Sequence, residues 1–341
     1  MTRLASEPDA PTLPPIQAHR PGGRVAVVPV DVMRIVRLTL LAVYFVVYVW
    51  YLRAYGLPLD RISVSISVAI FLLCAFLGRP LYMWAVLGLD IMLYALMWFT
   101  YDQTRGVADG LGTPRQLESV RNIDRFLFFG NDPNVWLQRR FWKPTVPWYE
   151  KVASTVYFTH FIFPVLAIAI LWYASHYQWS RFMKRFATLL MVACVMFVLL
   201  PTIPPWMAAG KNYRAIEPLK HSTGRGFFAL GFRGVVKTWQ RALDWGNPVA
   251  AMPSLHSAFA LMVPAFFLPW VRPKWVKAVL MIFPVIMLTS LVYFGEHWVI
   301  DGLVGWLLVG GSFWLWRKIE HRQRRRRADR ARAALGLVPA P

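Results

Sequence analysis

Long apolar runs alternate with short polar segments over most of the chain. A helix needs about 20 apolar residues to cross the ~30 Å hydrocarbon core of a bilayer, and several runs reach or approach that length. They lie at roughly 34–54, 61–78, 81–101, 150–174, 182–201, 252–270, 275–294 and 298–317. The pattern predicts an all-α integral membrane protein with about eight transmembrane helices. Only Gly78-Arg79-Pro80 separates the second run from the third, so a re-entrant hairpin is the alternative for that pair.

The segments between these runs divide the chain into five parts. Residues 1–30 are rich in Pro, Ala and Arg without apolar periodicity, which predicts a disordered N-terminal tail. No apolar core with a cleavage site occurs there, so the first spanning helix is expected to act as the signal. The other parts are N-terminal transmembrane helices at 31–101, an outer loop at 102–149, a transmembrane domain at 150–318 and a basic tail at 319–341.

The outer loop contains one amphipathic stretch, LESVRNIDRFLFFG. Its apolar positions are spaced as on one face of a helix, and they predict a helix that lies in the membrane interface. These positions are Val120, Ile123, Phe126, Leu127 and Phe128.

The composition supports a membrane protein and argues against other classes. Hydrophobic residues make up 57% of the chain and charged residues 16%, which is too apolar for an ordinary soluble domain. The 17 Trp, 13 Tyr and 23 Phe suit aromatic belts at two membrane interfaces. The net charge of +21 is better explained by basic loops beside anionic lipid than by nucleic-acid binding. Cys74 and Cys194 lie inside apolar runs, which indicates neither a disulfide framework nor a metal site.

Basic residues set the expected orientation of the helices. The loops at 181–185 and 272–277 and the tail after Trp316 are all basic, so by the positive-inside rule they face the cytoplasm. Both termini are then cytoplasmic, whereas residues 101–149 and 207–250 lie outside. We therefore expect a protein of the plasma membrane whose non-cytoplasmic face carries His256 and His297.

Two histidines and an aspartate stand at the ends of the last apolar runs. His256 opens one run, and His297 lies four residues before Asp301, where another begins. In a helix, positions i and i+4 share a face, so the Asp301 carboxylate is expected to reach the His297 ring. A carboxylate on one ring nitrogen fixes the tautomer and leaves the other nitrogen available as nucleophile or base. Interfacial histidines with a chance spacing are the alternative interpretation.

The residues around these histidines resemble a known family. PSLH at residues 253–256 is similar to the second motif of the type 2 phosphatidic acid phosphatase superfamily, Pro-Ser-x-His, and residues 290–301 resemble its third, Ser-Arg-x5-His-x3-Asp. LPTIPPW at 200–206, together with PSLH and FGEHWVID, looks like the inositol phosphorylceramide synthase branch. The resemblance covers roughly residues 182–316. It implies a six-helix phosphatase or phosphotransferase core.

The resemblance also implies a reaction. His297 would attack phosphorus to give a phosphohistidine, Asp301 would orient it, and His256 would protonate the leaving oxygen. The backbone N–H groups at Ser254 would hold an anion at the start of a helix. No metal and no cofactor are implied. The donor would be a lipid phosphate or phospholipid, such as phosphatidylinositol or a polyprenyl-phosphate compound, and the acceptor would be water, a lipid or a polyol.

The chain departs from the superfamily pattern at the phosphate-binding cations. Leu291 stands where the third motif has Arg, and the first motif, Lys-x6-Arg-Pro, is absent. The loop at 207–246 carries seven cations against two acids, and Lys211 and Arg214 are our candidates for a phosphate clamp. Arg225 and Arg233 are the alternatives, and a solvated basic loop without a clamp is another.

Asp90 and His160 lie deep in the third and fourth runs, where an ionisable group needs a partner or a cavity. We expect them to pair with one another, either as polar contacts between helices or along a substrate tunnel. A transporter or flippase would use them as ion sites, although internal inverted repeats are not evident. A membrane protein with a purely structural role is a further alternative, which the intact His256, His297 and Asp301 disfavour.

Overall fold

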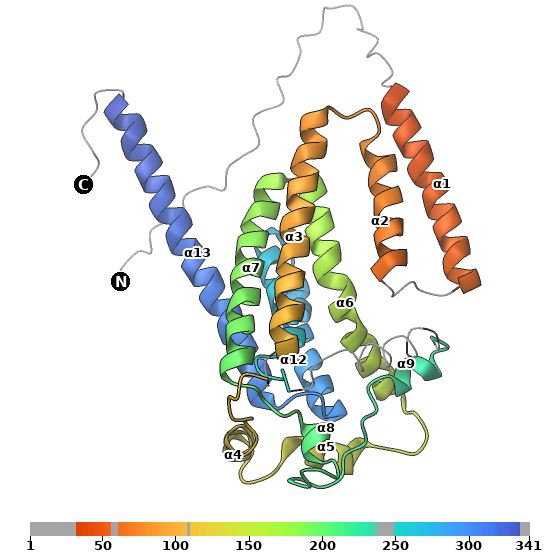
Figure 1. Ribbon diagram of the computed structural model, residues 1–341, viewed down its shortest axis with the longest axis vertical. Coiled ribbons are helices and arrows are strands. Elements are labelled where there is room, and N and C mark those ends of the chain that lie inside the picture. The colour runs from red at the N-terminus through yellow and green to blue at the C-terminus, as the bar shows by residue number, and fades with distance from the viewer. Residues whose placement is uncertain are drawn as a thin grey trace, which may run out of the picture.

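The computed structural model describes residues 32–55, 61–107, 110–232, 234, 236 and 249–334, without the side chains of residues 61–65 and 105. The expected tail at 1–30 and three cations of the basic loop, Arg233, Lys237 and Arg241, lie outside the described residues. Within those ranges the chain forms helices and turns but no strand. The elements are α1 (Val32–Tyr55), α2 (Arg61–Phe76), α3 (Leu81–Val107), α4 (Glu118–Leu127), α5 (Pro133–Phe141), α6 (Trp148–Ala174), α7 (His176–Leu199), α8 (Pro205–Ala208), α9 (Arg225–Ala229), α11 (Leu255–Phe267), η1 (Leu268–Trp270), α12 (Lys274–Phe294) and α13 (Val299–Ala334) (Figure 1).

Six of the described helices are long and apolar enough to cross a membrane: α1, α3, α6, α7, α12 and α13. The prediction of an all-α integral membrane protein is therefore confirmed. The two remaining apolar runs, at 61–78 and 252–270, form the shorter helices α2 and α11, of 16 and 13 residues. The number of crossings stays a prediction.

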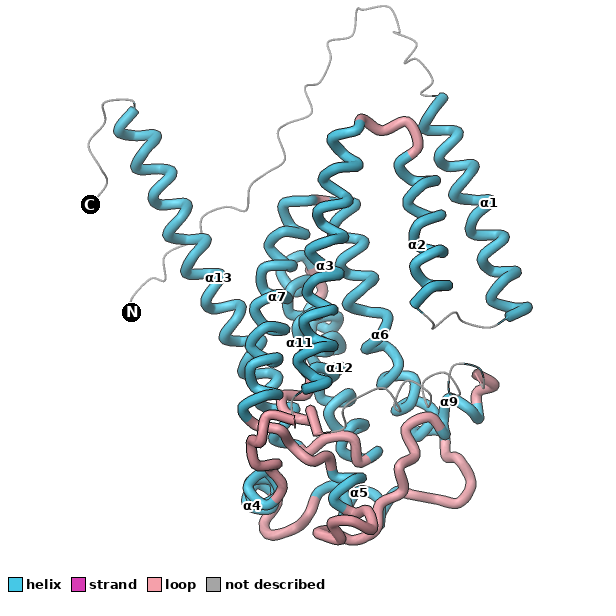
Figure 2. The backbone as a smooth tube through the Cα atoms, viewed as in Figure 1, coloured by secondary structure: helices cyan, strands magenta, loops and turns pink. Residues whose placement is uncertain are grey.

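The helices form an elongated bundle with its connecting segments gathered at one end. Figures 1 and 2 show α4, α5, α8 and α9 together beneath the bundle, and we call this the loop end. At the opposite end, short turns join α6 to α7 and η1 to α12. Because α12 ends and both α11 and α13 begin at the loop end, the sequence stretches with His256, His297 and Asp301 are brought to the same place.

Helix α7 forms the centre of the main apolar core. Its side chains Phe182, Phe186, Leu189 and Leu190 are fully buried, and they pack with residues of α3, α6, α11 and α13. Helix α1 has no buried residue, and many of its apolar side chains are exposed. Such an apolar exterior would be costly in water and is stable in hydrocarbon, which agrees with a membrane-embedded bundle.

The first turns of α11 and α13 pack closely because α13 carries glycine at the crossing. A Cβ on Gly305 would lie 2.7 Å from the Ser254 carbonyl oxygen and 3.4 Å from the Ala258 Cβ. Backbone cannot move aside as readily as a flexible side chain. The absence of a side chain at Gly305 therefore allows α13 to approach the start of α11.

We expect Gly305→Ala to destabilise the protein by about 1–3 kcal/mol, because the added methyl group would overpack this crossing. Thermal unfolding in detergent would measure the change. Gly310→Ala on the same helix is the matched control, since a Cβ there meets nothing within 4 Å. Equal unfolding temperatures for the two variants would show that the crossing tolerates a side chain.

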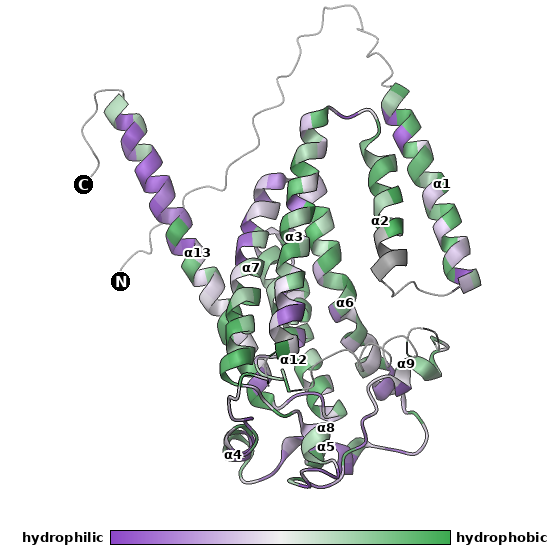
Figure 3. Cartoon of the chain, in the orientation of Figure 1, coloured by the Kyte–Doolittle hydropathy of each residue, from purple (hydrophilic) through white to green (hydrophobic). Residues whose placement is uncertain are grey.

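Helix α13 continues well beyond the apolar run that predicted it. The run ends near residue 317, whereas the helix extends to Ala334, and Figure 3 shows its second half as hydrophilic. Glu320 on this half accepts hydrogen bonds from Arg181 and Arg185 of α7, at 3.0 and 2.8 Å. The first part of the expected basic tail is thus helical and is paired to the bundle.

The expected pairing of Asp90 with His160 is wrong. The Asp90 Oδ2 atom accepts a hydrogen bond from Trp172 Nε1 and lies 2.8 Å from His176 Nε2, at the end of the bundle opposite the loop end. His160 instead lies against the ring of His256, with 3.9 Å between ring centroids. The two residues therefore do not form one polar site.

Candidate active site

Ser254 and His256 lie at the start of α11. Ser254 is the N-cap residue, and its Oγ accepts a hydrogen bond from the Ser257 N–H at 3.3 Å, as expected for a serine at this position. His256 follows in the first helical turn. The Ser254 N–H donates to the Asp301 carbonyl oxygen at 2.9 Å, which joins the start of α11 to the start of α13.

His297 and Asp301 contact one another, but not as two residues on a helical face. Helix α13 begins at Val299, so His297 precedes it, in the loop that follows the left-handed Gly295 (φ +76°). The Asp301 Oδ2 atom lies 3.3 Å from His297 Nδ1 and accepts a hydrogen bond from the Trp298 N–H at 3.0 Å. An acidic side chain in the first turn thus reaches back over the helix start, as in a capping box.

The two predicted histidines lie next to each other. Their ring centroids are 5.7 Å apart, and the Tyr157 ring stacks on His256 with 4.8 Å between centroids. Asp301 is fully buried, and His297 is nearly so. Because Asp301 faces Nδ1, the Nε2 atom of His297 is the ring nitrogen that the carboxylate does not occupy. The arrangement can supply one oriented nucleophile and one neighbouring acid or base.

Helix α5 holds the backbone around His297 through two amide side chains, a role that the sequence did not indicate. The Asn134 Nδ2 group donates to the carbonyl oxygens of Val292 and His297, at 2.8 and 3.0 Å. From α5, Gln138 donates to the Tyr293 carbonyl oxygen at 2.7 Å. The segment at 102–149 therefore forms part of the site's support rather than a separate surface feature.

Asp124 of α4 accepts hydrogen bonds at the start of α13. Its carboxylate binds the N–H groups of Val299 and Ile300, at 2.7 and 2.9 Å, and its side chain is fully buried. Burial raises the pKa of Asp124 to about 7, while the two backbone hydrogen bonds act in the opposite direction. The predicted amphipathic helix is present as α4, and this polar residue on its inner side anchors the helix that carries Asp301.

Glu296 links the His297 loop to the basic loop. It accepts a hydrogen bond from Thr223 Oγ1 and pairs with His221 Nε2 at 2.8 Å, and the Trp206 ring stacks on His221. Burial acts to raise the pKa of Glu296, but the hydrogen bonds from His221 and Thr223 outweigh it and lower the pKa below its usual range.

Residues 200–206 also meet the His297 loop directly. Trp298 Nε1 donates to the Ile203 carbonyl oxygen at 2.8 Å, and the Trp206 N–H donates to the Gly295 carbonyl oxygen at 2.9 Å. The three stretches that carried the family resemblance, at 200–206, 253–256 and 294–301, therefore converge on one site.

The candidate phosphate-binding cations differ in their surroundings. Lys211 and Arg214 follow α8 with exposed side chains, and among the described residues neither side chain has a hydrogen bond or an ion pair. Arg225 is already used, because it pairs with the buried Glu150 at 3.4 Å and donates to the Lys143 carbonyl oxygen. Arg233 lies outside the described residues.

Leu291, which stands in place of the motif arginine, is fully buried. It packs with Tyr157, Phe158, Met287 and Phe294 in an apolar cluster between α6 and α12. Burying a charged side chain among these apolar residues would be costly, whereas leucine packs with them. Within the described ranges, no group of three or more His, Cys, Asp or Glu side chains is placed to hold a metal ion.

Comparison with known proteins gives one result. A family model described as the PAP2 superfamily matches residues 118–315, which is more than half of the chain. The matched region begins at the first residue of α4 and includes Ser254, His256, His297 and Asp301. No curated protein and no solved structure matches the chain.

Proposed function

The chain belongs to the PAP2 superfamily, and from this membership we propose that it transfers a phosphate-bearing head group between lipids through a phosphohistidine at His297. Membership and the apolar helices already indicate a membrane protein with a phosphatase or phosphotransferase type of activity on lipid phosphates. The observation that carries the proposal is the convergence of His256 and His297, with their ring centroids 5.7 Å apart and Asp301 at His297 Nδ1.

The proposed reaction has two steps. In the first, the His297 Nε2 atom attacks phosphorus, the bond to the leaving oxygen breaks, and His256 gives that oxygen a proton. In the second, His256 takes a proton from the acceptor hydroxyl, whose oxygen attacks phosphorus and releases His297. Asp301 accepts the Nδ1–H of His297 in both steps and stabilises the positive charge that develops on the ring.

The acceptor decides between transfer and hydrolysis. Resemblance of residues 200–206, 253–256 and 294–301 to the inositol phosphorylceramide synthase branch supports transfer of an inositol-phosphate type of head group. Phosphatidylinositol or a polyprenyl-phosphate compound would be the donor, and a lipid or polyol hydroxyl the acceptor. A phosphatase that uses water is the alternative within the same chemistry.

A product assay tests the proposed function. Purified protein would be incubated with a panel of lipid phosphates and phospholipids, with and without alcohol acceptors, and the products identified by mass spectrometry. A new phosphodiester that appears only with an acceptor would support transfer, whereas free phosphate or a free head-group phosphate would indicate hydrolysis. The absence of any phosphorus-containing product across the panel would overturn the proposal.

We propose Lys211 and Arg214 as the phosphate clamp. Both follow α8, which is tied to the His297 loop through the Trp206–Gly295 hydrogen bond, and their charges are not neutralised by described residues. Phosphoryl transfer spreads negative charge over the equatorial oxygens, which a nearby cation stabilises. Lys211→Ala and Arg214→Ala should each reduce kcat/KM by about 10–100-fold, as for loss of a charge-assisted contact.

The control for this prediction is Lys274→Ala, which removes an exposed cation at the opposite end of the bundle and should leave kcat/KM unchanged. Steady-state kinetics on the donor found in the product assay would provide the comparison. Full activity of the Lys211→Ala/Arg214→Ala double variant would contradict the assignment and move the clamp further along the basic loop.

We also propose that the loop end faces away from the cytoplasm. The support is that the basic residues at 272–277 and the basic half of α13 lie at the other end of the bundle. A cysteine introduced at Asn212, an exposed position of the basic loop, should react with a membrane-impermeant maleimide in intact cells. Reaction only after the cytoplasmic side is opened would reverse the orientation.

A further inference from the structure

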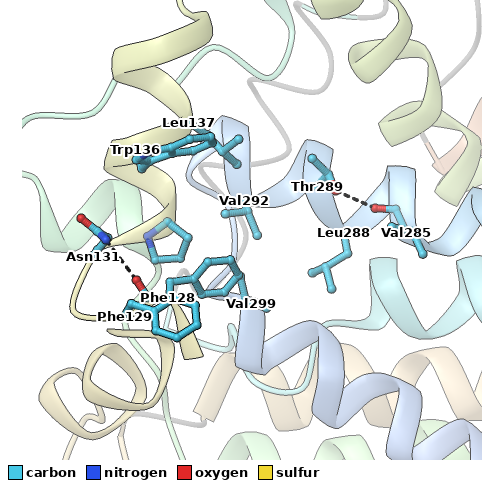
Figure 4. A pocket seen from close by; sticks show the side chains of 11 residues that line it. Phe128, Phe129, Asn131, Trp136, Leu137, Val285, Leu288, Thr289, Val292 and Val299 are labelled. Carbon is cyan, nitrogen blue, oxygen red and sulfur yellow. Dashed lines mark hydrogen bonds between the residues drawn. The ribbon is translucent and has the colours of Figure 1, made fainter. Parts of the chain in front are cut away.

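A cavity of about 480 Å³ lies between the outer helices and α12 at the loop end. Figure 4 shows Trp136 and Leu137 of α5 and Phe128 of the α4–α5 connection facing Val285, Leu288 and Val292 of α12 across it. The volume falls in the range of about 300–1,000 Å³ that is usual for binding sites of small molecules. We call this cavity the α5–α12 groove.

The groove is apolar even where its lining residues are polar. The Thr289 hydroxyl donates to the Val285 carbonyl oxygen at 2.9 Å, and the Asn131 amide donates to the Phe128 carbonyl oxygen at 3.1 Å (Figure 4). Each side chain therefore donates a hydrogen bond to a backbone carbonyl oxygen instead of into the groove. The groove offers little to water or to a polar head group, and it suits a hydrocarbon chain.

The position of the groove identifies the source of such a chain. Val285 is 52% exposed on α12, a helix long and apolar enough to cross the membrane, and the neighbouring Ile286 is exposed beside it. At the loop end the rim carries Phe129 and Trp136, with exposed aromatic rings of the kind found at membrane interfaces. A lipid chain could therefore enter from the bilayer without crossing water.

The groove also borders the loop that carries His297. Val292 and Val299 line it, and they lie on either side of that loop in the sequence. Asn134 joins the Val292 and His297 carbonyl oxygens next to the same cavity. We infer that the α5–α12 groove holds one hydrocarbon chain of the lipid substrate while its head group is processed at His297. This inference rests on the proposed function.

Photolabelling tests the occupant without requiring turnover. The probes are phosphatidic acid and phosphatidylinositol, each with a diazirine on one acyl chain, and phosphatidylcholine with the same chain, in phosphatidylcholine vesicles. Phosphatidic acid or phosphatidylinositol should label residues 285–292 and 128–137, and the matching unlabelled lipid should displace it. Equal labelling by phosphatidylcholine without displacement would mean that bulk lipid occupies the groove, and absence of labelling would mean that no chain does. Either result would overturn the inference.

Two variants with a matched control link the groove to turnover. Thr289→Trp fills the groove, and Phe128→Ala removes one wall. Ile282→Trp places the same bulk on α12 at an exposed position that does not line the groove. On a long-chain substrate, the two groove variants should lose about tenfold or more in kcat/KM, because the chain contributes binding energy, while Ile282→Trp should not. On a short-chain soluble analogue, all three should stay within about twofold of the wild type.

The outcomes separate this inference from the proposed function. An active enzyme whose groove variants keep full long-chain activity would contradict the groove alone. An inactive protein across the whole substrate panel would contradict the proposed function, and photolabelling would still report whether an anionic lipid chain occupies the groove. Thermal unfolding of each variant would show whether it is folded, and a loss on long-chain and short-chain substrates alike would count against a chain-binding role.

Discussion

Replacing His297 with alanine is expected to abolish turnover, because the substitution removes the nitrogen that would form the bond to phosphorus. The loss of kcat should be at least about 10⁴-fold, as when an enzyme loses a covalent nucleophile. The measurement is product formation with the preferred donor, together with trapping of labelled phosphate on the protein. A phosphohistidine is stable in base and labile in acid, so the trapped bond can be identified.

His256→Ala should separate the two steps. A substrate with a good leaving group, such as p-nitrophenyl phosphate, needs little protonation, so the variant should still form the phosphoenzyme from it. Transfer to the acceptor should slow by about 10²–10⁴-fold because the base is missing, and the phosphoenzyme should accumulate.

His321→Ala is the control for both histidine variants, since this exposed residue lies on the polar half of α13. It should keep the activity of the wild type. If His297→Ala also kept near wild-type activity, the hypothesis of a phosphohistidine intermediate at His297 would be wrong for this chain.

Asp301→Asn is expected to lower kcat/KM by about 10²–10⁴-fold while the protein remains folded, by analogy with loss of the orienting acid in a catalytic triad. The carboxylate both faces His297 Nδ1 and accepts the Trp298 N–H. The side-chain oxygen of asparagine can still accept the hydrogen bond from the Trp298 N–H. The neutral amide, however, cannot stabilise the positive charge that develops on the His297 ring. The helix start should survive, and the nucleophile should lose its correct tautomer.

Two measurements distinguish orientation from a merely structural role of Asp301. Thermal unfolding of Asp301→Asn should stay close to the wild type, and the rate of phosphoenzyme formation should fall with the overall rate. Asp329→Asn, an exposed position near the end of α13, is the matched control and should change neither. A large fall in unfolding temperature with an unchanged rate for the folded fraction would assign Asp301 to stability instead.

Much of the bundle could be predicted because length and apolarity are local properties of the chain. The same criterion fails where a helix continues beyond the bilayer. The predicted end of α13 near residue 317 reflects loss of apolarity, but Ala and Arg are good helix formers, and Glu320 pairs with Arg181 and Arg185 of α7. Weighing helix propensity beside hydrophobicity would have extended the helix.

The candidate site could be predicted only as far as its residues carry local signals. The spacing of His297 and Asp301 indicated a contact, and the contact exists, but the same spacing also fits an acid that reaches back across a helix start. Asp124, Asn134 and Gln138 gave no signal at all, because they bind backbone groups more than 150 residues away. Backbone N–H and C=O groups are nearly the same in every residue. The sequence therefore does not indicate which of them a distant side chain will bind.

The support that Asn134 and Gln138 give to the His297 loop bears on how the protein is made. Both side chains belong to α5, yet these partners lie at the end of α12 and in the connection between the last two helices. Helix α5 is synthesised before α12 and α13. Until those two helices have been made, the amide groups of Asn134 and Gln138 lack these partners. His297, the proposed nucleophile, is positioned only when the final helix has been inserted and Asp301 contacts it. A partly inserted chain would therefore contain His256 and most of the basic loop but not the assembled candidate site, so the proposed activity would begin only once the bundle is complete.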